Sequence, residues 1–140
     1  MGFLDLFKGK GKAVRVLTAD DDLGVVRLLK DILQMQGYTV ITANCGADAI
    51  RLALSEHPDL ILLDIRMPGM SGLQVLASLK GDPKTRNIPV VMVTAEQKGK
   101  DFEDAFALGA KGYILKPIRM EQVVKKVTAI VPPPTKPSTP

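Results

Sequence analysis

Short, densely apolar runs alternate with longer stretches of helical apolar spacing along most of this 140-residue chain. Five runs are dense enough to be strands covered on both faces, at 14–19, 38–43, 60–64, 90–94 and 113–115. After each run, apolar residues recur every three or four positions, as on one side of a helix, at 25–33, 49–54, 73–79, 102–109 and 123–131. Five such units in strict alternation predict a three-layer α/β/α sandwich, with helices on both faces of a parallel sheet.

The most favoured arrangement of five such units is a flavodoxin-like (βα)5 fold with strand order 2-1-3-4-5. Turn-forming residues agree with these boundaries, since Gly37 follows the first helical stretch and Pro58 and Pro89 precede the third and fourth runs. We therefore predict one domain over residues 13–131. Residues 1–12 are expected to form a basic arm, and the Pro-rich residues 132–140 an extended tail.

The net charge of +4 lies mainly in these terminal segments, which carry four lysines against one aspartate. A nucleic-acid-binding domain should carry its basic patch on the folded part, so we expect no direct nucleic-acid contact. Cys45 is the only cysteine and no apolar run approaches the roughly 20 residues needed to cross a bilayer, which favours the cytoplasm. Weak membrane contact by the arm, through an apolar face at 3–7, is a less favoured alternative.

Polar side chains stand where the apolar runs end. Ligands of an open parallel sheet bind beyond the carboxyl ends of its strands, at the point where the strand order reverses. The residues at these ends are Asp20, Asp21, Asp22, Asp64, Thr94 and Lys116. A single aspartate suffices to cap a helix, so Asp22 is the expected cap, whereas Asp20 and Asp21 are free to serve a metal ion.

Carboxylates that converge on one edge of a sheet repel one another, and a hard cation relieves that repulsion. Mg²⁺ fits because it takes oxygen ligands and commonly binds one or two carboxylates together with phosphate oxygens. In such a site Asp64 can act as a nucleophile toward a phosphoryl donor. Lys116 and Thr94 can each contact a phosphate oxygen, and these few groups suffice because phosphoryl transfer depends mainly on positioning and electrostatics.

These residues, in this order, resemble the receiver domain of bacterial two-component response regulators, with a likeness that runs from about residue 13 to residue 131. The matching motifs are the acidic cluster at 20–22, the segment LLDIRMPGMSG at 62–72, Thr94-Ala95, Tyr113 and Lys116-Pro117. The resemblance implies that Asp20, Asp21, Asp64 and the carbonyl of Arg66 hold Mg²⁺. It further implies that Asp64 is the phosphoacceptor, that Thr94 and Tyr113 are switch residues, and that a cis bond joins Lys116 to Pro117.

The same resemblance implies a mechanism and its partners. A histidine kinase or phosphotransfer protein donates the phosphoryl group, and the receiver catalyses only its own phosphorylation and dephosphorylation, so no enzyme activity on a metabolite is expected. Phosphorylation then remodels the surface formed by the fourth helix, the fifth strand and the fifth helix. Because 140 residues leave no room for an output domain, the signal is expected to pass to a downstream protein by direct contact, as in single-domain regulators.

Three other functions are less favoured. A metal-dependent phosphatase with an aspartate nucleophile would place that aspartate after the first strand, with a second acid two positions later, whereas Arg66 stands two after Asp64. A flavodoxin-like cofactor binder would need a phosphate-binding loop where this chain has Asp20 to Asp22, and these acids would repel an anionic cofactor. A degenerate receiver that acts only as an interaction module would lack part of the site, which is complete here.

Overall fold

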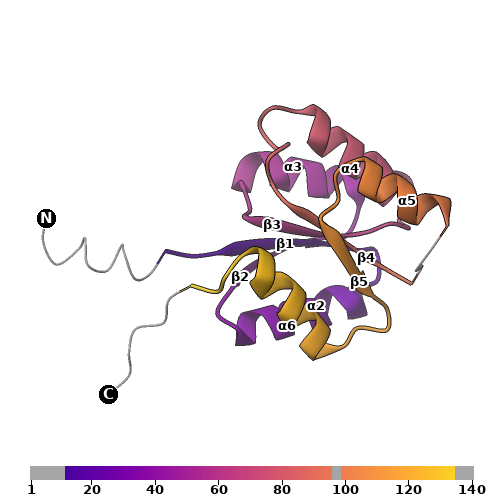
Figure 1. Cartoon of the computed structure of the whole chain (residues 1–140). Helices are drawn as coiled ribbons and strands as arrows, with labels where there is room; N and C mark the ends of the chain where they lie inside the picture. The colour runs from indigo at the N-terminus through magenta and orange to yellow at the C-terminus, as the bar shows by residue number, and fades with distance from the viewer. Residues whose placement is uncertain (1–11, 96–98, 135–140) are drawn as a thin grey trace, which may run out of the picture.

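The computed structural model describes residues 12–95 and 99–134. Its strands are β1 (Arg15–Ala19), β2 (Thr39–Ala43), β3 (Leu60–Asp64), β4 (Val90–Thr94) and β5 (Gly112–Leu115). Its helices are α2 (Leu23–Met35), α3 (Gly46–Glu56), α4 (Gly72–Gly81), α5 (Lys100–Ala107) and α6 (Met120–Ile130) (Figure 1). Most of the predicted basic arm and tail, residues 1–11 and 135–140, lies outside the described residues.

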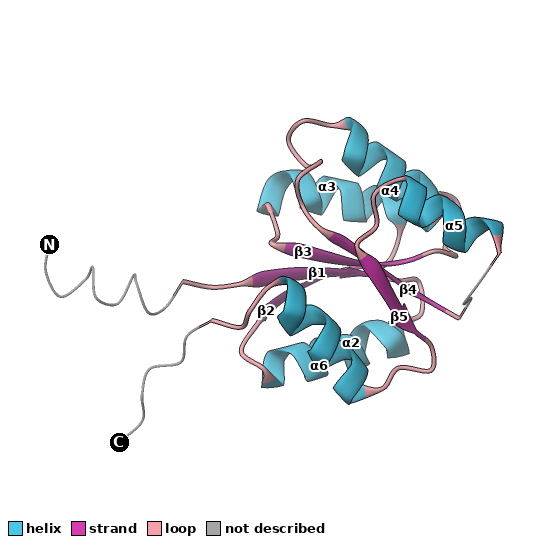
Figure 2. Cartoon of the chain, in the orientation of Figure 1, coloured by secondary structure: helices cyan, strands magenta, loops and turns pink. Residues whose placement is uncertain are grey.

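The five strands form one parallel sheet in the order β2-β1-β3-β4-β5, as predicted. Helices α3, α4 and α5 cover one face of this sheet, and α2 and α6 cover the other, which completes the three-layer sandwich (Figure 2). The strand order reverses between β1 and β3, which are direct neighbours in the sheet. The carboxyl ends of β1 and β3 therefore meet at the predicted ligand-binding edge.

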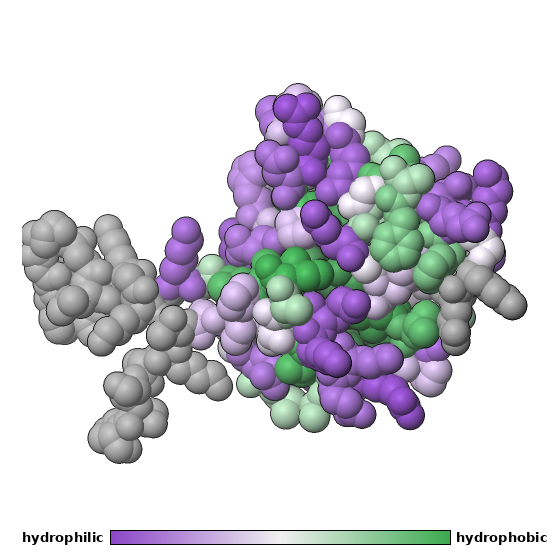
Figure 3. All heavy atoms as spheres, viewed as in Figure 1, coloured by the Kyte–Doolittle hydropathy of each residue, from purple (hydrophilic) through white to green (hydrophobic). Residues whose placement is uncertain are grey.

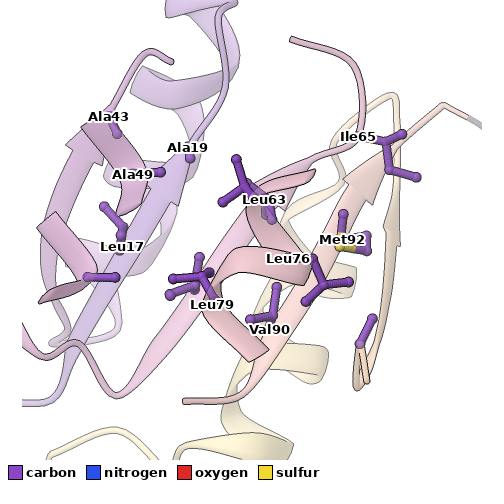
Figure 4. Close-up of a cluster of buried hydrophobic side chains, with 14 of the residues drawn as sticks. Leu17, Ala19, Ala43, Ala49, Leu63, Ile65, Leu76, Leu79, Val90 and Met92 are labelled. Atoms are coloured by element: carbon purple, nitrogen blue, oxygen red, sulfur yellow. The ribbon is translucent and has the colours of Figure 1, made fainter. Parts of the chain in front are cut away.

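Neighbouring residues of each central strand point into different cores. In β3, Ile61 and Leu63 pack under α3, α4 and α5, whereas Leu60 and Leu62 pack against α2 and α6. Figure 4 shows part of the first core, in which Leu63 lies near Leu76 and Leu79 of α4. Because every residue of β3 and β4 is buried, these strands need a continuous apolar run, and this is the pattern that identified them.

Helix α5 differs from its predicted extent, because it ends at Ala107 and leaves Gly109 beyond it. Gly109 has a φ of +105°, a conformation that glycine adopts without strain and that ends the helical path. Within the predicted apolar stripe, Ala105 is buried, but Phe106 is 46% exposed. The stripe is therefore a core face only in part. The exposed Phe106 ring makes an edge contact with Tyr113 of β5.

The last helix is joined to the start of β2 by a hydrogen bond between residues 93 positions apart, in which the Tyr38 hydroxyl donates to the Val131 carbonyl at 2.6 Å. Tyr38 is buried, so this bond satisfies a phenolic hydroxyl that would otherwise lie without a partner in the core. Burial also raises the pKa of Tyr38 above its usual value. Among residues 12–95 and 99–134, no helix is both long and apolar enough to span a bilayer.

Candidate functional site

The carboxyl ends of β1 and β3 bring Asp20, Asp21 and Asp64 together. One carboxylate oxygen from each residue lies within 4.8 Å of the other two, which makes these three a possible metal-binding group. Asp20 and Asp64 are buried, with 2% and 5% exposure, whereas Asp21 is exposed. Two buried acids and one solvent-facing acid thus share one edge of the sheet, as the sequence predicted.

Local hydrogen bonds fix the acids that follow β1. The Asp20 Oδ1 atom accepts a hydrogen bond from the Asp22 amide at 2.9 Å, and the Asp20 amide donates to the Ala43 carbonyl on β2 at 3.2 Å. Asp22 is the N-cap of α2, and its Oδ1 atom accepts from the amides of Gly24 and Val25. The structure confirms that Asp22 is a cap. The turn it makes leaves the second oxygen of Asp20 directed toward the site.

The loop after β3 is held close to the start of α4. The Gly72 amide donates to the Ile65 carbonyl at 2.7 Å, and a Cβ atom at position 72 would lie only 2.0 Å from the Asp64 carbonyl oxygen. Only glycine allows the backbones to approach this closely. Ser71 and Gln74 complete a capping box, in which each side chain binds the backbone amide of the other. Helix α4 therefore fixes the loop that directly follows Asp64.

Lys116 reaches both buried acids from the end of β5. Its ammonium nitrogen lies 3.0 Å from the Asp20 Oδ2 atom and 3.4 Å from the Asp64 Oδ2 atom. The bond between Lys116 and Pro117 is cis, as the resemblance implied. The Lys116 amide donates to the Thr94 carbonyl at 2.9 Å, so the predicted lysine and the predicted hydroxyl are linked through their backbones.

The ionisation of Asp64 reflects this crowded charge. Burial is the main cause that raises its pKa from 3.8 to about 6, and the nearby Asp20 carboxylate raises it further. The charge of Lys116 and a hydrogen bond from the Arg66 amide act in the opposite direction. Burial lowers the pKa of Lys116, but its hydrogen bond to Asp20 and the two carboxylate charges outweigh this, so its pKa is raised overall. Both groups are therefore charged at neutral pH.

The residues present fit a hard divalent cation. Mg²⁺ holds its oxygen ligands at about 2.0–2.1 Å and often keeps bound waters, so three oxygens within 4.8 Å of one another can share the ion by moving closer or through a bound water. Asp20 Oδ2 is buried and, apart from its ion pair with Lys116, has no hydrogen-bond partner in the described part of the chain. Lys116 offsets only part of the negative charge of the three carboxylates, so this buried oxygen still favours a second cation.

The remaining predicted residues lie around this group. Thr94 is buried at the end of β4 and its strand partner is Leu115 of β5. One guanidinium nitrogen of Arg66 lies 3.9 Å from a carboxylate oxygen of Asp101 on α5. Tyr113 lies on β5, two positions before Leu115, and its ring contacts α5. The structure therefore brings Asp20, Asp21, Asp64 and Lys116 together, while Tyr113 belongs to a neighbouring aromatic cluster.

Sequence reasoning missed three residues around the site: Gly72, Asp101 and Phe102. Gly72 was considered only as part of the segment at 62–72, although a glycine that directly follows a strand and a short loop can mark a close approach of two backbones. Asp101 and Phe102 stand at the start of the weakest helical stripe, and their contacts cross from one element to another. No pattern within the sequence of α5 could identify these partners.

A model of the response regulator receiver domain matches residues 16–128. The chain is 43% identical over 106 residues to the response regulator PleD of Caulobacter vibrioides, a match that covers 76% of this chain and 23% of PleD. It is 38% identical over 112 residues to the polar-differentiation response regulator DivK of Brucella ovis, covering 80% of this chain and 91% of DivK. The chain thus spans about a quarter of PleD but nearly all of DivK.

Among solved structures, the chain is similar to the chemotaxis response regulator CheY4 of Vibrio cholerae, with a TM-score of 0.81 and 28% sequence identity. This likeness covers 86% of the present chain and 100% of CheY4. It also resembles a CheY-like receiver domain protein from Methanospirillum hungatei, with a TM-score of 0.79 and 26% identity over 84% of the chain and 93% of that protein. These two structures share the fold of the chain.

Proposed function

Because this chain belongs to the response regulator receiver family, we propose that it is a phosphorylatable switch that accepts a phosphoryl group on Asp64. The proposed donor is a histidine kinase or a phosphotransfer protein, and the proposed output is contact with a downstream protein in the cytoplasm. The chain would catalyse only its own phosphorylation and dephosphorylation. We propose no reaction on a small metabolite.

One observation carries this proposal. Asp64 is a buried carboxylate that shares its edge of the sheet with two further acids and with the ammonium group of Lys116. A structural ion pair needs only one acid for one base, so the excess of negative charge suits a site that takes up a cation. The proposed ligands of Mg²⁺ are Asp20, Asp21, Asp64 and the carbonyl of Arg66. When bound, the ion would offset the charge that develops on the transferred phosphoryl group.

The residues of the chain have separate roles in the proposed transfer. An ionised oxygen of Asp64 forms a new bond to phosphorus, while the bond from phosphorus to the donor nitrogen or oxygen breaks and the donor leaves with that electron pair. Lys116, already 3.4 Å from an oxygen of Asp64, would pair with a phosphate oxygen. The Thr94 hydroxyl would donate a hydrogen bond to another. These contacts hold the acyl phosphate once it has formed.

The proposed switch follows from contacts that only the phosphorylated state makes. Thr94 would move toward the phosphate, Tyr113 would change its side-chain orientation, and the surface formed by α5, β5 and α6 would change with them. A phosphoryl group can shift the balance between two states only through contacts that differ between them. The Lys116 amide already donates to the Thr94 carbonyl, so changes at the ends of β4 and β5 are directly connected.

Phosphorylation assays test the proposed acceptor. The wild-type chain should incorporate phosphate from acetyl phosphate in the presence of Mg²⁺, and intact-mass spectrometry should show a single added phosphoryl group. Asp64→Asn should not be labelled. Asp59→Asn is the matched control, since Asp59 is an exposed acid at the opposite end of β3 and should leave labelling unchanged. Full labelling of Asp64→Asn would refute the assignment.

The metal-dependent phosphatase alternative has a direct test as well. A phosphatase would turn over a generic phosphoester such as p-nitrophenyl phosphate many times for each protein molecule. A receiver should release product no faster than Asp64 loses its phosphoryl group. Sustained turnover that is lost in Asp64→Asn would therefore replace the signalling proposal with an enzymatic one.

A further inference from the structure

The side chain of Tyr113 makes two contacts with Phe102 of α5. The rings of Tyr113 and Phe102 are stacked, with centroids 3.9 Å apart and an angle of 14° between their planes. In addition, the Tyr113 hydroxyl donates a hydrogen bond to the Phe102 carbonyl oxygen. Phe106 adds only an edge contact, with a centroid distance of 4.9 Å and an angle of 62°.

A change in the Tyr113 rotamer must therefore break both of these contacts with Phe102. Stacked aromatic pairs contribute beyond the area that they bury, and the half-buried Tyr113 hydroxyl would lose its acceptor. We infer that Phe102 is a positioning residue, whose ring holds Tyr113 against α5 and so sets how readily the switch turns. This inference rests on the proposed function for its consequence, whereas the restraint on Tyr113 can be measured without phosphorylation.

The stacked pair also shapes the surface that the proposed switch would alter. Phe102 and Tyr113 line a groove of about 500 Å³ together with Leu115 and residues of α6. In Figure 3, hydrophobic side chains appear among hydrophilic ones on the side where Figure 1 places α5 and β5. A turn of Tyr113 away from Phe102 would remove one wall of this groove. The same contact thus controls both the orientation of the tyrosine and the shape of the surface beside it.

Nuclear magnetic resonance of the unphosphorylated full chain tests the restraint. In the wild type, the ring protons of Tyr113 should be shifted upfield by the Phe102 ring, and side-chain couplings should indicate one dominant rotamer. Phe102→Leu and Phe102→Met remove the aromatic ring but keep an apolar side chain of similar volume. Each should raise the ratio of the alternative rotamer to the observed one about fivefold. With these two variants, here called the ringless variants, one can still decide the test when the other does not fold.

Two controls separate positioning from simple packing. Phe102→Tyr keeps the ring and should restore the wild-type Tyr113 signals. Phe106→Leu removes the exposed edge contact on the same helix and should change the rotamer ratio by about twofold at most. Unchanged Tyr113 signals in both ringless variants would overturn the inference. So would an equal or larger change in Phe106→Leu.

Labelling by acetyl phosphate and Mg²⁺ connects this restraint to the proposed function. If phosphorylation favours the turned state of Tyr113, the ringless variants should reach half-maximal labelling at about a fivefold lower donor concentration. Failure of the wild type to be labelled would refute the proposed function alone, because the rotamer measurements would still decide the role of Phe102. Labelling curves that coincide for wild type and both ringless variants would disprove that Phe102 acts on the switch.

Discussion

Asp64 is buried and carries a negative charge, and burying this charge lowers the stability of the folded state. Its pKa is raised from 3.8 to about 6, mainly by burial and then by the Asp20 carboxylate. The folded state therefore holds a proton more tightly than the unfolded state between these two values. It follows that the free energy of unfolding decreases as pH rises through this window and levels off above it.

We expect Asp64→Asn to be more stable than the wild type in a metal-free buffer at pH 7.5, by about 1–3 kcal/mol. The difference should shrink as pH falls from 6 toward 4, because both proteins then carry a neutral side chain at position 64. Urea denaturation in EDTA across this pH range measures the effect. The matched control is Asp31→Asn, an exposed acid on α2, for which the curves should stay parallel to the wild type. A less stable Asp64→Asn at pH 7.5 would contradict the sign of this argument.

A second buried polar group lies in β1. Thr18 is fully buried, and its hydroxyl has no hydrogen-bond partner within residues 12–95 and 99–134. Replacing an unsatisfied hydroxyl with a methyl group of the same shape removes a desolvation cost. Thr18→Val should thus raise the free energy of unfolding by about 1 kcal/mol.

The register of the sheet supplies a matched control for this substitution. Thr42 of β2 stands directly opposite Thr18 but is exposed, so Thr42→Val should change stability by less than about 0.5 kcal/mol. Thermal and urea denaturation of the two variants give the comparison. A clear loss of stability in Thr18→Val would mean that its hydroxyl is satisfied in solution.

At the scale of the elements, the junction of β3 and α4 fixes the position of Asp64, the proposed acceptor. A Cβ atom at position 72 would lie 2.0 Å from the Asp64 carbonyl oxygen, so Gly72→Ala must displace either the helix or the strand. We expect a loss of about 2–4 kcal/mol in stability and little or no labelling by acetyl phosphate. Gly81→Ala, at the other end of the same helix, has open space around its Cβ and should be neutral or stabilising by up to about 1 kcal/mol.

If Gly72→Ala were labelled like the wild type, the close contact between α4 and the end of β3 would not be needed to position Asp64. The pairing with Gly81 matters because both changes raise the helix propensity of α4 by the same amount. Only at Gly72 would the added Cβ meet the backbone of Asp64 and Ile65. The two variants therefore separate the effect of the junction from the intrinsic preference of alanine for a helix.

How far the sequence could predict these elements depended on where their contacts lie. The strands β3 and β4 were predicted residue for residue, since both faces are buried and the apolar run is continuous. Asp20, Asp64 and Lys116 were also predicted together, because parallel strands present their carboxyl ends at one edge. The stack of Phe102 on Tyr113 was not predicted, because α5 is short and its stripe is broken by the exposed Phe106. The bond from Tyr38 to Val131 likewise left no local signal in the sequence.

At the scale of the whole molecule, the proposed metal site would link cation binding to folding. A cation that binds only the folded state raises the free energy of unfolding, by about 2.7 kcal/mol when its concentration is one hundred times its dissociation constant. We expect Mg²⁺ in the millimolar range to raise the urea midpoint of the wild type. Asp20→Asn should abolish this stabilisation, because it removes a buried ligand and the local excess of negative charge.

Asp22→Asn is the matched control for metal-dependent stability. Asparagine caps a helix about as well as aspartate, so this variant should keep both its basal stability and the full effect of Mg²⁺. Denaturation curves of the three proteins, with and without the ion, check both statements. An equal effect of Mg²⁺ on Asp20→Asn and the wild type would place the ion elsewhere.

The described chain enters β1 and leaves α6 at the same end of the sheet, since the bond from Tyr38 to Val131 lies beside the first residues of β2. Figure 1 shows both paths leaving on one side of the domain. The acids and Lys116 occupy the opposite, carboxyl end of the strands. A fluorophore attached near residue 12 or residue 134, the two ends of the described chain, would therefore leave the acidic edge of the sheet open.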